Sequence, residues 1–143
     1  MQANHWQWAE KTFGRAWAEE GKDPAASFAN KYKIEAALET GSAARAAVAD
    51  ANSLLYLVKA NQIFATAGAA NLEGLKKIKA KTLILSTPTD QVFAQEWVRA
   101  TTEAIKAGGA SVETADITGI FGHLNGVLSL APLAPKIAEF LGK

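Results

Sequence analysis

The sequence predicts an α/β fold, in which a helical N-terminal segment precedes a parallel βαβα unit. Three observations lead to this prediction. Apolar residues recur at three- and four-residue steps through much of the first seventy residues, as on one face of a helix. The apolar run Thr82–Leu85 lacks polar alternation, which is typical of a strand buried on both faces of a parallel sheet. The segments after this run alternate between helical and strand patterns.

The first helix is expected to begin near Trp6 and to end at Gly21. Its aromatic residues lie on one helical stripe, which consists of Trp6, Trp8, Phe13 and Trp17. Such a stripe fits the core between two helices. Its density of large aromatic side chains also fits a surface that packs on another domain or subunit, or that covers an active site. The sequence leaves both interpretations open.

Two further helices are expected before residue 70. Asp23–Pro24 has the pattern of an N-cap followed by proline at the first helical position, and the helix that it starts should run to Gly41. Ser42 then offers a cap for a third helix. A break is expected at Asp50–Ser53, because short polar side chains there compete for backbone hydrogen bonds.

A run of small residues over 66–71 predicts the boundary between two parts of the chain. The first part, 1–70, is the helical segment, and the second part, 71–143, is the βαβα unit. The elements expected in the second part are a strand over 82–86, a helix over 94–107 that Gly108 and Gly109 end, a strand over 111–116, and a final helix that Pro132 and Pro135 bend or restart.

Two parallel strands form a small sheet for an independent domain, and strand 82–86 would leave a hydrophobic edge open. We therefore expect the chain to be one part of a larger doubly wound sheet. The remainder would be a missing N-terminal half of the core or a second chain. The open edge and the aromatic helices also predict self-association into a homo-oligomer.

Composition excludes several kinds of site. The 143 residues include no cysteine, so disulfides, zinc–thiolate sites and cysteine nucleophiles are excluded. The formal net charge is +1, and the one dense basic cluster, Lys76–Lys81, has no interleaved aromatic residues, so no nucleic-acid partner is predicted. His5 and His123 lie far apart in the sequence without a carboxylate cluster, so we predict no metal site.

The sequence also lacks the signals of a bound nucleotide cofactor and of a membrane partner. It contains neither a G-x-G-x-x-G motif nor a phosphate-binding P-loop. Its apolar runs are shorter than a membrane span, and its N-terminal residues lack the regions of a signal peptide. A cytoplasmic location is the expectation.

Two chemically versatile residues follow the two predicted strands. Asp90 comes after the first strand, and His123 comes after the second, between Gly122 and Gly126. Ligands of open α/β sheets bind beyond the carboxyl ends of the strands, and a helix with a parallel return strand fits between these residues. A carboxylate paired with one imidazole nitrogen leaves the other nitrogen free to act as a general base. The alternative is an ordinary turn with a capping histidine.

Several motifs carry a resemblance to a known family. They are Phe13–Trp17, Asp23–Pro24, Ile34–Leu38, the Asp-Ala-Asn-Ser segment Asp50–Ser53 with the residues that follow it, Ser86–Phe93 with Glu96, and Gly122–His123. Together they resemble the α/β-hydrolases and, more narrowly, the homoserine O-acetyltransferases. The resemblance covers nearly the whole chain. It implies the C-terminal part of an α/β-hydrolase fold, preceded by a helical lid segment that in this family also contributes to dimer contacts.

The resemblance further implies a Ser–Asp–His triad in which Asp90 is the acid and His123 is the base. The nucleophile elbow G-x-S-x-G does not occur in this sequence. No strand–elbow–helix context surrounds Ser53, Ser86, Ser111 or Ser129, so none of these four is expected to be the nucleophile. We therefore expect the chain alone to be catalytically incomplete. The implied chemistry is acyl transfer or ester hydrolysis on a small-molecule substrate, without a permanently bound cofactor and with acetyl-CoA as the donor in the case of transfer.

One position departs from the family pattern. Homoserine transacylases usually carry an acidic residue directly after the catalytic histidine, whereas this sequence has Leu124. An apolar side chain cannot compensate a buried ammonium group, which favours an ester hydrolase or transfer to another acceptor over transfer to homoserine. A non-catalytic helical dimerisation module with a degenerate α/β-hydrolase tail is the alternative from a different class.

Overall fold

The computed structural model describes residues 5–64 and 71–142, which form two compact units. One unit comprises Trp8–Ile63, and the other comprises Phe64–Lys143 with the N-terminal residues up to Gln7. The predicted boundary over 66–71 lies almost entirely outside the described residues, and the proposed division at residue 70 stays a prediction. None of the helices in the described part of the chain is long and apolar enough to cross a membrane.

The first helix is shorter than predicted. Helix α1 spans Trp6–Thr12, and Gly14 follows it with a φ of 54°, in the left-handed region that suits glycine. The chain then extends, and Trp17 forms an antiparallel bridge with Tyr32. The expected end at Gly21 is therefore wrong. The stripe is not continuous on one helix, although the rings of Trp8 and Phe13 meet edge to face, with centroids 5.3 Å apart.

Helix α2 spans Lys33–Val48 and begins nine residues later than the Asp23–Pro24 pattern predicts. The Asp23 carboxylate accepts a hydrogen bond from the Ala25 N–H at 2.8 Å, but it closes a local turn. The carboxylate of Glu35 instead accepts the Tyr32 N–H, at 2.6 Å, at the true start of the helix. Gly41 lies inside α2, so the predicted stop there is wrong, and so is the predicted helix start at Ser42.

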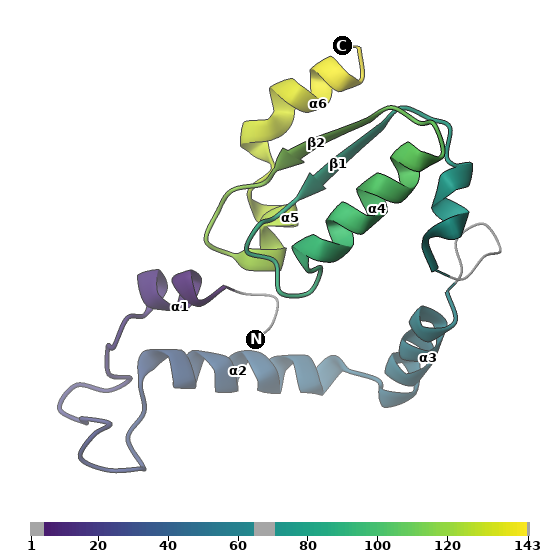
Figure 1. Ribbon diagram of the computed structural model, residues 1–143. Helices are drawn as coiled ribbons and strands as arrows, with labels where there is room; N and C mark the ends of the chain where they lie inside the picture. The colour runs from purple at the N-terminus through teal and green to yellow at the C-terminus, as the bar shows by residue number, and fades with distance from the viewer. Residues whose placement is uncertain (1–4, 65–70, 143) are drawn as a thin grey trace. The chain divides into compact units, whose positions relative to one another are not determined.

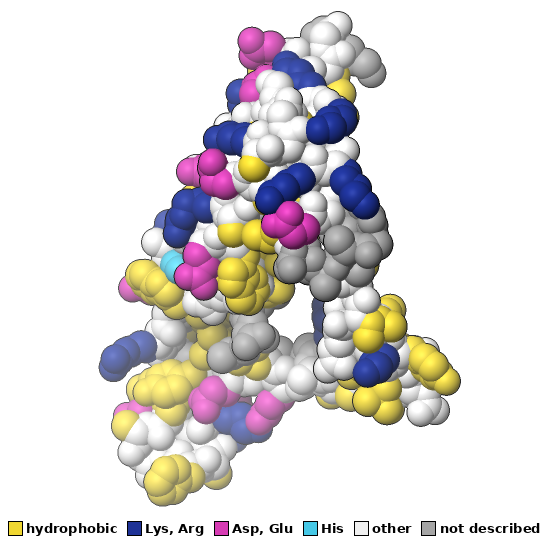
Figure 2. All heavy atoms as spheres, turned by 45° about the vertical axis from the view of Figure 1, so that its right-hand side comes forward, with side chains coloured by type: hydrophobic (Ala, Val, Ile, Leu, Met, Phe, Trp, Pro, Cys, Tyr) yellow, Lys and Arg dark blue, Asp and Glu magenta, His cyan; other side chains and the backbone are white. Residues whose placement is uncertain are grey.

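The break at residue 50 is confirmed. The carboxylate of Asp50 caps helix α3 (Ala51–Gln62) by accepting the N–H groups of Asn52 and Ser53, at 3.4 and 2.8 Å. Residues 54–58 of α3 are all apolar or aromatic and are each 46–79% exposed. Hydrophobic side chains crowd the surface of this helix in Figure 2. Five consecutive apolar residues extend around a full turn of the helix, and a helix segment that is apolar on every side is normally buried. Residues 54–58 therefore expose surface that a folded protein usually covers.

The second unit contains the predicted parallel sheet. Strand β1 spans Thr82–Ser86 and strand β2 spans Val112–Asp116, and they pair in parallel from Thr82 opposite Val112 to Ser86 opposite Asp116. Helix α4, Gln95–Ala107, crosses between them (Figure 1). The other elements are the 3₁₀ helices η1 (Asn71–Lys77), η2 (Gly122–Leu124) and η3 (Ala131–Leu133), and the helices α5 (Asn125–Leu128) and α6 (Ala134–Phe140).

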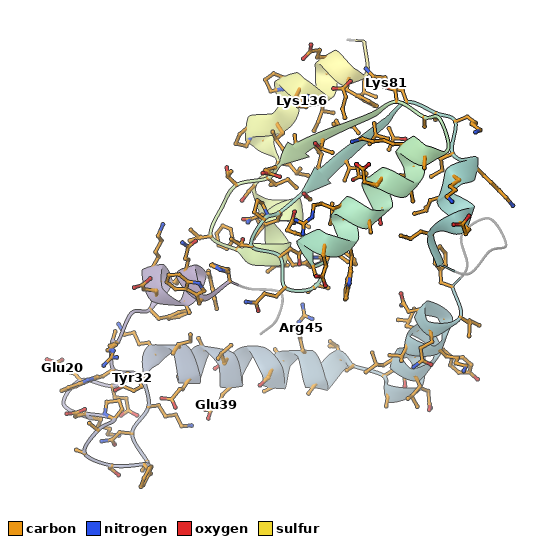
Figure 3. All side chains as sticks on the ribbon, viewed as in Figure 1. Glu20, Tyr32, Glu39, Arg45, Lys81 and Lys136 are labelled. Atoms are coloured by element: carbon orange, nitrogen blue, oxygen red, sulfur yellow. The ribbon has the colours of Figure 1, made fainter. Side chains whose placement is uncertain are left out.

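Alternate residues of β2 identify what covers each face of the sheet. Glu113 accepts a hydrogen bond from Lys136 of α6 at 3.2 Å, whereas Thr114, which points the opposite way, lines a groove with residues of α4. Lys81 also pairs with Glu113 at 2.8 Å and lies over the Phe140 ring, 4.6 Å from its centroid. Lys81 and Lys136 lie together at this end of the unit in Figure 3. Helices α4 and α6 thus cover opposite faces.

The core of this unit is small. Among the described residues, the buried hydrophobic side chains are Ala104, Ile105, Ala110 and Ile117. Every residue of β1 is half-buried, so the predicted burial on both faces is only partly realised. Helix α4 and η1 approach closely at Gly108. A Cβ atom on Gly108 would lie only 2.1 Å from the Lys76 carbonyl oxygen, so there is no room for a side chain at this position.

Candidate active site

The structure brings Asp90 and His123 together. Asp90 Oδ2 lies 2.8 Å from His123 Nδ1, although the residues are 33 positions apart. The pairing of Ser86 with Asp116 ends both strands at the same end of the sheet. Asp90 lies in the turn beyond β1, and His123 lies on η2 beyond β2. The predicted meeting is confirmed, and the catalytic roles of the two side chains stay a prediction.

The turn after β1 is held by one carbonyl group. The Thr87 oxygen accepts the Asp90 N–H at 3.0 Å and the Gln95 side-chain amide at 2.8 Å. Thr87 itself is only 4% exposed. Because this one carbonyl group binds both the backbone of the turn and the first residue of helix α4, it fixes the position from which the Asp90 side chain starts.

The Asp90 carboxylate is oriented by three donors. Oδ1 accepts the N–H groups of Val92 at 2.7 Å and Phe93 at 3.0 Å, which leaves Oδ2 for His123. The side chain is 9% exposed. Burial raises the pKa of Asp90, but the hydrogen bonds from His123, Phe93 and Val92 outweigh it and hold this pKa below the ordinary value. The carboxylate is therefore ionised at neutral pH.

His123 lies on η2, one residue after Gly122. Gly122 is buried and has a φ of 59°, a left-handed conformation that a side chain would strain. The imidazole meets the Phe93 ring at an interplanar angle of 65°, with centroids 5.2 Å apart. Because a carboxylate only accepts hydrogen bonds, Nδ1 carries the proton that faces Asp90, and in the neutral ring Nε2 is the basic nitrogen.

A cavity of about 270 Å³ adjoins the Asp90–His123 pair. Its apolar walls come from Ile84, Leu85, Phe93, Val98 and Ile117. Asp90 is the only carboxylate among the described residues that line it. Because that carboxylate already binds His123, the cavity offers an apolar ligand group a better match than a cationic one.

Two residues near the pair were missed by the sequence reasoning. Phe93 contacts the imidazole, and Asn125 is fully buried next to the histidine-bearing turn. For Phe93 no local pattern signals the contact. Asn125 does carry a signal, because an amide within the otherwise apolar stretch that leads into the final helices is a candidate buried polar group.

The other residues singled out in the sequence are placed as follows. Leu124 is half-buried at the end of η2. Ser86 ends β1 and Ser129 follows α5, so neither lies on a strand–elbow–helix turn. His5 accepts a hydrogen bond from the Gln7 N–H at 3.4 Å and contacts the Trp6 ring, which is a local structural role.

Curated proteins align with most of the length of this chain. It is 28% identical to a homoserine O-acetyltransferase of Methanosphaera stadtmanae over 92% of the chain and 27% of the relative. It is 30% identical to a serine O-succinyltransferase of Litchfieldella anticariensis over 94% of the chain and 38% of the relative. The chain thus spans between about a quarter and two fifths of these proteins. No family model matches it.

Solved structures share its fold. A homoserine O-acetyltransferase from Bacillus anthracis superposes with a TM-score of 0.79 at 23% identity, covering 100% of this chain and 38% of that one. Esterase E22 superposes with a TM-score of 0.74 at 30% identity, covering 98% and 39%. The chain therefore has the fold of the C-terminal portion of an α/β-hydrolase and resembles the homoserine O-acetyltransferases.

Proposed function

We propose that this chain supplies the acid and the base of a serine-dependent acyl transfer, with Asp90 and His123 in these roles. The observation that carries the proposal is the 2.8 Å contact between Asp90 Oδ2 and His123 Nδ1 beyond the ends of two parallel strands. The nucleophilic serine would come from the remainder of the hydrolase core, since this sequence holds no G-x-S-x-G elbow.

The chemistry would divide between the two side chains. His123 Nε2 takes the proton of the serine hydroxyl as that oxygen attacks the acyl carbonyl, and it returns the proton to the leaving group. Asp90 holds the imidazole in the Nδ1–H tautomer and stabilises the imidazolium that forms. An acceptor then attacks the acyl-serine with His123 again acting as the base. Acetyl-CoA is the donor that the family resemblance implies.

The acceptor is proposed to be uncharged, either water or a neutral alcohol. Leu124 follows the histidine, and Asp90 is the only carboxylate among the described cavity residues, so an acceptor ammonium would lack a counter-ion. Esterase E22, at 30% identity, is consistent with this preference. We therefore favour ester hydrolysis over transfer to homoserine.

The test is to co-express the chain with a segment that carries the G-x-S-x-G elbow, and to assay acetyl-CoA and p-nitrophenyl ester turnover. His123→Ala should lower kcat by about 1000-fold or more, because the base is lost. His5→Ala is the matched control and should leave kcat unchanged. Full activity of the His123→Ala protein would refute the proposal.

The acceptor preference has its own test in the same system. Leu124→Asp should raise the rate of transfer to homoserine relative to hydrolysis, since a carboxylate beside the site can pair with the ammonium. Leu124→Asn, which adds polarity without charge, is the control. An unchanged ratio in the aspartate variant would show that position 124 does not select the acceptor.

A further inference from the structure

We propose that Asn125 is the positioning residue that fixes His123 against Asp90. Asn125 has no exposed surface, and its side-chain oxygen Oδ1 accepts two hydrogen bonds. One comes from the Phe121 N–H at 3.2 Å, and the other comes from the Ser129 hydroxyl at 3.0 Å. These donors lie four residues before and four residues after Asn125, so a single oxygen ties both sides of the turn that carries His123.

The orientation of the amide follows from its partners. A backbone N–H can only donate a hydrogen bond, so the atom that faces Phe121 must be the oxygen. The Asn125 Nδ2 is buried and has no hydrogen-bond partner among the described residues. The side chain is therefore held through Oδ1, and an acceptor at this point is what the turn requires.

Gly119 completes the enclosure. A Cβ on Gly119 would lie 2.2 Å from Asn125 Oδ1 and 2.8 Å from the Ser129 hydroxyl oxygen. The φ of Gly119 is not in the left-handed region, so the backbone conformation does not require glycine here. The close contact with Asn125 and Ser129 is what excludes a side chain at position 119. Asn125 Oδ1 is thus enclosed from both sides of His123. The backbone of residues 119 and 121 contacts this oxygen from before the histidine, and the Ser129 side chain contacts it from after the histidine.

The consequence for His123 is geometric. Gly122, directly before the histidine, has a left-handed φ, and its neighbour Phe121 is fixed through the hydrogen bond to Asn125. Without that bond the Phe121 N–H would be left unpaired in a half-buried turn, which favours rearrangement. The hydrogen bond between His123 Nδ1 and Asp90 depends on the same turn, so it should weaken when Oδ1 is removed.

The inference deepens the proposed function and rests on it for its catalytic meaning. Its test does not need an activity assay, because the hydrogen bond itself can be observed by NMR. The 143-residue chain is labelled with ¹⁵N-histidine and ¹³C-aspartate. The downfield Nδ1 proton of His123 reports its hydrogen bond, and the Asp90 carboxyl shift reports the pKa of that group. Asn125→Ala should abolish the downfield proton and raise the Asp90 pKa toward its ordinary value. Asn125→Asp keeps an acceptor oxygen and should retain both signals.

A second substitution displaces the amide without removing it. Gly119→Ala should weaken the same signals, whereas Gly41→Ala, where a Cβ meets no atom within 4 Å, should leave them unchanged. Thr102→Ala removes another buried hydroxyl, which donates to the Val98 oxygen at 2.8 Å, and controls for general loss of stability. Ser129→Ala, which removes one of the two donors, is the fallback if Asn125→Ala does not fold, and it should weaken the downfield proton.

The outcomes separate cleanly. An intact downfield proton in folded Asn125→Ala, or in the Ser129→Ala fallback, overturns the positioning role, and so does equal loss in Thr102→Ala. If the signals behave as expected but His123→Ala retains activity in the co-expressed enzyme, the positioning inference stands and the proposed function fails.

Discussion

Asp90 Oδ2 contacts His123 Nδ1 at 2.8 Å, while Asp90 Oδ1 accepts the N–H groups of Val92 and Phe93. One carboxylate thus has one oxygen fixed by its own turn and the other directed at the imidazole. Replacing it by an amide separates these two functions, because an asparagine can keep the turn and lose the charge.

We expect Asp90→Asn to lower kcat of the co-expressed enzyme by roughly 1000- to 10,000-fold, as removal of the orienting carboxylate does in serine triads. The physical cause is loss of the group that selects the Nδ1–H tautomer. Steady-state ester hydrolysis measures the effect. Asp23→Asn, which alters a carboxylate in an exposed turn of the other unit, should change kcat by less than about twofold. Similar losses in both variants would contradict the assignment.

The lowered pKa of Asp90 predicts an acid-dependent loss of stability. A group whose pKa is lower in the folded state stabilises the fold above its unfolded pKa, about 3.9 for aspartate, and this contribution disappears as the pH falls through the folded value. Urea midpoints of the wild type and of Asp90→Asn should therefore differ at pH 7 and converge below about pH 4.

The comparison with Asp90→Asn is needed because other carboxylates titrate in the same range. The pKa of Asp50 is lowered chiefly by hydrogen bonds from Ser53, and that of Glu113 chiefly by those from Lys81 and Lys136. Their contributions appear in both proteins and cancel in the difference. A gap between the two midpoints that is constant from pH 7 to pH 3 would exclude a stabilising role for ionised Asp90.

Phe93→Ala tests the ring contact with His123. Edge-to-face aromatic pairs contribute about 0.5–1.5 kcal/mol beyond burial, so kcat/KM should fall by up to roughly tenfold. Phe93→Leu keeps the apolar cavity wall and isolates the aromatic part. The reference is Phe28→Ala, because Phe28 is exposed and contacts no other ring in the part of the chain that the structure describes. An effect of Phe93→Leu as large as that of Phe93→Ala would assign the loss to the ring itself.

Gly108→Ala tests the approach of η1 to α4. The added methyl group would meet the Lys76 backbone at 2.1 Å, and backbone cannot give way as a flexible side chain can. We expect a loss of about 1–3 kcal/mol in the free energy of unfolding, measured by urea titration. Gly41→Ala lies inside α2, where an added Cβ would meet none of the described atoms within 4 Å, and it should be neutral or stabilising. Equal stability of the two variants would argue that η1 is not anchored at this contact.

Much of the second unit could be predicted from the sequence because its signals are local. The apolar run Thr82–Leu85 identifies β1, and Gly108 marks the end of α4. The bounds of the helices before residue 50 were predicted less well. Asp23 and Gly41 have the residue types of helix boundaries, but no helix begins or ends at either position. At Asp23 a turn competes successfully for the same carboxylate, and at Gly41 the helix continues through a residue of low propensity.

The site divides in the same way. The meeting of Asp90 and His123 follows from strand order, which the sequence pattern encodes. The contact between Phe93 and His123 depends on side-chain direction after a turn, and the enclosure of Asn125 depends on the close approach of Gly119. Neither contact has a spacing rule. The sequence can mark Asn125 as a candidate buried amide, but only the three-dimensional structure shows what encloses it and what Phe93 contacts.

The register of β1 and β2 has a consequence for how this region can evolve. The strands end together because Ser86 is paired with Asp116, and that pairing does not depend on the length of the connection between them. Residues can therefore be gained or lost at the far end of the crossover without changing the distance between acid and base. A slip of one residue in the ladder would instead separate them at once. Related sequences should accordingly differ in the length of the loop before β2 but keep the register between β1 and β2.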